Sequence, residues 1–196
     1  MSEWWTYQPS DLLMFSARTW GRLLEAHNRQ AWPLQPVLLA IGLVLLWQSL
    51  RQPRSALPWS GVVLACAWGW VAWSFHGQRH ADISTAAPWL AAAWALQAGL
   101  LLVFGTRAAP QRPPAWQAGA GLGTALVALV GYPLAAPLGG RGWAQAEVAG
   151  LFPEPTALFT AGLLLALPLR RRAVLMPIPL LSLALGWTTA WLLGAR

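Results

Sequence analysis

The sequence predicts an all-α fold: a polytopic membrane bundle of six transmembrane helices, preceded by an N-terminal amphipathic surface helix. Two observations carry this prediction. Of 196 residues, 57% are hydrophobic and only 10% are charged, whereas soluble domains carry about 25% charged residues. The apolar residues also form long runs, and a spanning helix needs about 20 of them. We therefore divide the chain into an N-terminal tail, 1–32, and a transmembrane bundle, 33–196.

The tail contains an amphipathic segment at 16–29. Trp20, Leu23 and Leu24 recur at helical spacing, while arginines occupy another face. Such a helix lies on the membrane surface. It would serve as an anchor or a lid on the bundle, or alternatively as a docking site for a partner.

Six runs without a charged residue are the candidate spans: 33–50, 57–75, 86–104, 116–138, 156–169 and 173–193. Pro133 interrupts the fourth. The fifth has about 14 residues and would be about 21 Å long, so it either begins earlier or packs inside the bundle without spanning fully. Many of the 15 tryptophans mark the ends of these runs, as expected at membrane interfaces. Trp68 and Trp70 lie mid-span and either face lipid or fill the bundle.

The charged residues predict the orientation. All thirteen basic residues are arginine, so chemistry that depends on a phosphate-loop or Schiff-base lysine is excluded. Nucleic-acid binding is not expected either, because the arginines lie between apolar runs rather than on one polar face. The loops after the first, third and fifth runs hold arginines and no acid, including Arg170, Arg171 and Arg172. Cytoplasmic loops are rich in such cations, which places both termini in the periplasm and the protein in a bacterial inner membrane.

Small residues four apart indicate close helix packing. Gly61, Ala65 and Gly69 share one face of the second run, and Gly119 and Gly123 share one face of the fourth. Such spacing allows backbones to approach closely in lipid. These faces would pack the bundle internally or form a homo-oligomer.

The candidate functional residues lie on the side of the termini: His27, His76, His80, Asp82, Glu147, Glu154 and Thr156. We expect them to form a ligand or partner surface. His76 and His80 share a face if their helix continues, although Gly77 could end it. Histidines and carboxylates together can hold a metal, so a metal or haem site stays open, while no cofactor is expected.

The segment from Pro153 to Thr156 predicts the start of a helix. Proline is well placed in the first turn, and Glu154 and Thr156 could meet the free N–H groups there. No zinc-protease, Cys-x-x-Cys, nucleophile-elbow or phosphate-loop motif is present. The protein is therefore expected not to be an enzyme.

Three stretches resemble an uncharacterised family of six-helix bacterial membrane proteins: Tyr132-Pro133-Leu134, Pro153-Glu154-Pro155-Thr156-Ala157-Leu158-Phe159-Thr160-Ala161-Gly162-Leu163-Leu164, and Met176-Pro177-Ile178-Pro179. The second carries the family's Pro-x-Pro-Thr-x-x-Phe-Thr-x-Gly-Leu-Leu signature. The resemblance implies a domain of unknown function, some of whose members are labelled permeases. Members often have Cys at the position of Glu154 and Gly-His at the position of Gly140-Arg141, so a ligand of those residues could be lost or replaced here.

Together these features predict a non-enzymatic accessory or scaffold subunit of a membrane assembly. Its expected partners are the lipid bilayer and either another membrane protein or a second copy of the chain. A small-solute or ion permease is the alternative, and a metal- or haem-binding membrane protein is a third interpretation.

Overall fold

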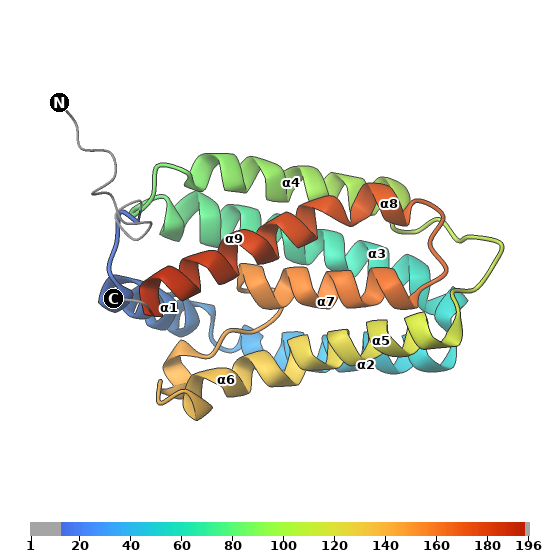
Figure 1. Cartoon of the computed structure of the whole chain (residues 1–196), viewed down its shortest axis with the longest axis horizontal. Coiled ribbons are helices and arrows are strands. Elements are labelled where there is room, and N and C mark those ends of the chain that lie inside the picture. The colour runs from blue at the N-terminus through green and yellow to red at the C-terminus, as the bar shows by residue number, and fades with distance from the viewer. Residues whose placement is uncertain (1–12, 195–196) are drawn as a thin grey trace.

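The computed structural model describes residues 13–194, and the described residues form helices and no strand. In chain order the elements are α1 (Ala17–Ala31), α2 (Leu34–Arg51), α3 (Pro53–Trp70), the π-helix η3 (Val71–His80), α4 (Ala87–Phe104), α5 (Ala115–Leu126), the π-helix η4 (Val127–Gly131), α6 (Tyr132–Leu138), the 3-10 turn η5 (Trp143–Gln145), α7 (Pro153–Ala166), α8 (Arg172–Leu175) and α9 (Pro177–Gly194). The predicted all-α class is confirmed. The long helices lie roughly side by side along the molecule, and α1 lies across one end (Figure 1).

Five helical stretches are long and apolar enough to cross a membrane: Leu34–Arg51, Pro53–His80, Ala87–Phe104, Ala115–Leu138 and Arg172–Gly194. They match five of the six predicted runs within a few residues. The remaining run corresponds to α7, which has 14 residues. At 1.5 Å per residue α7 is about 21 Å long, whereas the hydrocarbon core of a bilayer is about 30 Å thick. Within residues 13–194 the structure thus supplies five membrane-length helices, and a sixth span stays a prediction.

Helix α7 is the centre of the bundle. Eleven of its fourteen residues are buried, and it lies between α5 and α9 in Figure 1. A Cβ on Gly162 would come within 2.6 Å of the Ala125 backbone nitrogen and 2.7 Å of the Gly121 carbonyl oxygen. The backbones of α5 and α7 therefore approach so closely that only glycine fits.

The two helix faces of small residues, on α3 and on α5, differ in how closely they pack against other helices. Gly61 makes a close approach, since a Cβ there would lie 2.8 Å from the Gly105 carbonyl carbon at the end of α4. A Cβ on Gly119 or Gly123 would meet nothing within 4 Å. Gly119 and Gly123 therefore do not pack inside the bundle, because α5 turns the face of Gly121 toward α7 instead; contact of this face with a second copy of the chain stays a prediction.

Aromatic packing fills the middle of the bundle. The Trp68 side chain is fully buried and stacks on Trp94 of α4, with ring centroids 3.7 Å apart. Its Nε1 donates a hydrogen bond of 2.8 Å to the Thr160 hydroxyl on α7. Trp68 thus fills the bundle, whereas Trp70 is partly exposed.

Two helices widen into π-helical turns. The first is η4, which directly precedes α6 and Pro133. Because Pro133 has no N–H and its ring would clash with a carbonyl one turn earlier, the wider turn of a π-helix accommodates it. The second case is η3, which continues α3 past Gly77 to His80. The predicted end of the helix at Gly77 does not occur.

The two ends of the bundle differ in charge. The loops between α2 and α3, between α4 and α5, and between α7 and α8 lie at the end opposite both the N- and C-terminal ends of the described chain (Figure 1). These loops and the helix ends beside them carry Arg51, Arg54, Arg107, Arg112, Arg170, Arg171 and Arg172. The Arg172 Nε donates a 2.6 Å hydrogen bond to the Leu164 carbonyl oxygen, which satisfies a free acceptor at the end of α7.

Candidate functional site

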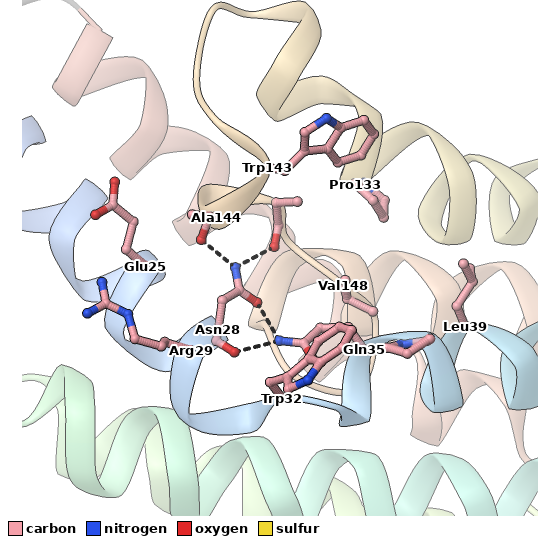
Figure 2. Close-up of a pocket in the computed structure, with 12 residues that line it drawn as sticks. Glu25, Asn28, Arg29, Trp32, Gln35, Leu39, Pro133, Trp143, Ala144 and Val148 are labelled. Atoms are coloured by element: carbon pink, nitrogen blue, oxygen red, sulfur yellow. Dashed lines mark hydrogen bonds between the residues drawn. The ribbon is translucent and has the colours of Figure 1, made fainter.

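Helix α1 is fastened to the bundle by side-chain amides. Ser16 caps its first turn by accepting a hydrogen bond from the Thr19 N–H. The Asn28 Nδ2 donates hydrogen bonds of 2.9 and 2.8 Å to the carbonyl oxygens of Ala144 and Ala146 (Figure 2). The Gln35 side chain on α2 donates to the Asn28 carbonyl oxygen at 2.7 Å. Helix α1 therefore covers one end of the bundle as a lid.

The largest cavity at this end is mostly apolar. It has a volume of about 650 Å³ and lies between α1, α2 and the segment from α6 through η5, where Figure 2 shows Trp32, Leu39, Trp143 and Val148 around it. None of the predicted site residues lines it. Its apolar walls suit a hydrocarbon chain rather than a charged ligand.

His76 and His80, here called the histidine pair, lie side by side. Because η3 continues through Gly77, their Nδ1 atoms come within 3.2 Å of each other. Only one of two facing ring nitrogens can donate in such a contact between neutral rings. The His76 side chain is 3% exposed, and its Nε2 has no hydrogen-bond partner in the described part of the chain.

His27 does not join the histidine pair directly. It packs edge-on against Phe75 and Phe152, with centroid distances of 5.5 and 5.2 Å, and Phe75 also contacts the rings of His76 and His80. Burial lowers the pKa of His27 below its ordinary value, and the positive charge of Arg79 acts in the same direction. His27 is therefore held as a neutral ring in an aromatic contact.

Glu147 and Glu154 line one cavity of about 520 Å³, here called the carboxylate cavity. It lies between α1, α6, the loop after η5, the start of α7, and α9. Arg141 and Glu147 form a salt bridge of 3.4 Å. Burial raises the pKa of Glu147, and the charge of Arg141 opposes that rise.

Glu154 has no basic side chain beside it among the described residues, and a glycine on α9 leaves the space that its carboxylate occupies. A Cβ on Gly186 of α9 would overlap its carboxylate, so the acid fits only because this position has no side chain. Its Oε2 is buried and has no hydrogen-bond partner among the described residues. A smaller cavity of about 60 Å³ is lined by Glu154 together with the histidine pair.

Thr156 and Asp82 lie outside this arrangement. The Thr156 hydroxyl accepts a 2.7 Å hydrogen bond from the Gly150 N–H and donates one of 2.6 Å to the Phe152 carbonyl oxygen. Its role is to fix the turn before α7, where Gly150 adopts a φ of 92°. Phe152 takes the N-cap position of α7 without a side-chain hydrogen bond, and the Thr156 hydroxyl bonds the turn before α7 rather than a free N–H of its first turn. Asp82 is exposed in the η3–α4 loop.

Sequence reasoning did not assign Tyr132, Arg141, Gly186 and Trp187 to a site. All four line the carboxylate cavity, and the Trp187 Nε1 donates a 2.6 Å hydrogen bond to the Tyr132 hydroxyl. These residues come from segments far apart in the chain, and no spacing rule joins them. The family resemblance had marked the position of Arg141, and the break at Pro133, which follows Tyr132, was a second local signal.

A metal centre finds little support in this geometry. Within residues 13–194, no group of three or more histidine, cysteine or acidic side chains is placed to hold a metal ion. Transition-metal sites in proteins are usually built from three or four such ligands. The histidine pair supplies two, and Glu154 is not placed with them as a third ligand.

The described residues form a helical bundle with five membrane-length helices and an acidic cavity at one end. The chain belongs to a family of unknown function, DUF6064, whose model matches residues 18–196. No curated protein and no solved structure matches it. The membership confirms the resemblance to an uncharacterised family, and it carries no activity or ligand with it.

Proposed function

We propose that this protein is a non-enzymatic, integral protein of the bacterial inner membrane that serves as an accessory or scaffold subunit of a membrane assembly. The observation that carries the proposal is the packing of α7. It packs against α5, α9 and α3, with the backbones of Gly121 and Gly162 in close approach. A helix packed this closely at the centre leaves little room for a solute path between the two ends.

In this proposal α7 is the sixth helix inserted in the membrane, shielded from lipid by its neighbours. Both termini are periplasmic, and the arginine-rich loops are cytoplasmic. A permease is the second candidate, favoured by the carboxylate cavity at the end of the termini, since buried acids in membrane proteins commonly lie on solute pathways.

Purification from the native membrane in mild detergent tests the first proposal. We expect the tagged protein to elute with a membrane protein partner in fixed stoichiometry. Elution as a lone chain, together with uptake of small solutes by liposomes that contain the pure protein, would contradict the accessory role and support the permease. Empty liposomes are the control for leakage.

A further inference from the structure

The carboxylate cavity has an excess of negative charge. Its lining contains two carboxylates, Glu147 and Glu154, and one guanidinium, that of Arg141. Arg141 forms its salt bridge with Glu147, so Glu154 has no basic partner among the described residues. A buried, unpaired carboxylate is costly unless it is protonated or meets a cation.

The walls of the cavity add aromatic faces to this charge. Tyr132 and Trp187 line it together, and their mutual hydrogen bond fixes the two rings relative to each other. Trp20 from the lid helix α1 lies on another side. Carboxylates and aromatic rings in one pocket are the groups that recognise ammonium ions, because the ring faces attract a cation without hydrating it.

The volume favours an organic cation over a metal ion. About 520 Å³ is within the usual range for small-molecule sites, and it far exceeds the space of a bare ion. The described residues also supply no cluster of three metal ligands. Quaternary ammonium compounds need fewer directional ligands, since their charge is spread over carbon-bound hydrogens.

An independent observation lies on the other side of Glu154. The 60 Å³ cavity there touches both Glu154 and His76, and each of these side chains has one buried atom without a partner, Oε2 and Nε2 respectively. Glu154 therefore borders both cavities, and no basic side chain among the described residues pairs with it.

We propose that the carboxylate cavity binds a small organic cation with an ammonium group, with Glu154 as its counter-ion and Tyr132 and Trp187 as its aromatic wall. Glu147 and Arg141 balance each other at the edge of the site. Gly186 is part of the site because any side chain there would displace the Glu154 carboxylate.

Calorimetric titration of the purified full chain in detergent tests this site. The probe is choline chloride, and the matched control ligand is 3,3-dimethylbutanol, which has the same shape without the charge. We expect saturable binding of choline and none of the alcohol. Equal binding of both would overturn the proposal, as would displacement of choline by equimolar sodium, which would indicate a metal-ion site.

Two variants locate the site. Glu154→Gln should weaken choline binding by at least about tenfold, because it removes the buried counter-charge, while Asp82→Asn, on an exposed loop, should bind like the wild type. If Glu154→Gln fails to fold, Trp187→Leu decides, and it should weaken binding by about two- to thirtyfold through the lost ring. Unchanged binding in whichever folded variant is measured would overturn the proposal.

Discussion

At the scale of single residues, the polar groups at the end of the termini have separate roles. Thr156 holds a turn, His27 packs against rings, and Glu154 faces two cavities. The residue types were visible in the sequence, but their roles depend on partners from other helices. Gly186, which makes room for Glu154, lies 32 residues away from it in the chain.

We expect the stability of the protein to fall as the pH is lowered through about 6.5, in part because of His27. Its folded-state pKa lies below the ordinary value of 6.5, so the unfolded chain takes up the proton first and gains free energy relative to the fold. Stability from this group is complete above about pH 6.5 and is lost below it.

Comparison with His27→Phe isolates the effect, because this variant keeps an aromatic ring and removes the titration. Between about pH 7.5 and 5, the melting temperature in detergent should fall further for the wild type than for the variant. The difference should be about 2–4 °C for each kcal/mol that protonation of His27 removes from the free energy of unfolding. His76 and His80 are present in both proteins and cancel in the comparison. Equal losses would show that His27 does not titrate differently in the fold.

At the scale of helices, the boundaries were largely predictable and the faces were not. The membrane-length runs could be located because lipid demands about 20 apolar residues. A run that is apolar all round gives no signal for its buried side, so Gly121 could not be distinguished from Gly119 or Gly123. The extension of α3 through Gly77 was missed for a related reason: glycine often ends a helix in water, but here η3 is packed against α1 and α4.

The contact between α5 and α7 can be tested with one methyl group. Gly162→Ala should destabilise the protein by about 1–3 kcal/mol, because the added Cβ would meet backbone atoms that cannot move separately. Gly123→Ala is the matched control, since its Cβ would enter open space, and alanine favours a helix by about 1 kcal/mol over glycine. Similar melting temperatures of the two variants would contradict the proposed packing.

At the scale of the whole molecule, the acids and histidines of residues 13–194 lie at one end and the acid-free arginine loops at the other. The sequence predicted this division because each apolar run reverses the direction of the chain. It could not predict the carboxylate cavity, which combines α1, α6, α7 and α9. Nor could it show that α1 is fastened to the bundle, because the link is made through Asn28 and the carbonyl oxygens of a distant loop.

We expect the arginine loops to be cytoplasmic. In a Cys66→Ser background, Arg112→Cys should react with a membrane-impermeant maleimide only after the cells are opened. Asp82→Cys, at the opposite end and also exposed, should react in intact cells whose outer membrane has been made permeable. The reverse pattern of labelling would show that the orientation is inverted.

The central position of α7 has a consequence for how the protein is made. This helix emerges from the ribosome after α1–α6 and before α9, so the preceding helices must hold a groove open until it arrives. Its threonines and Glu154 would meet lipid if it were inserted alone, and its length is short for a bilayer. We therefore expect α7 to enter a groove left by the earlier helices, and α9, which follows it in the chain, to cover it last.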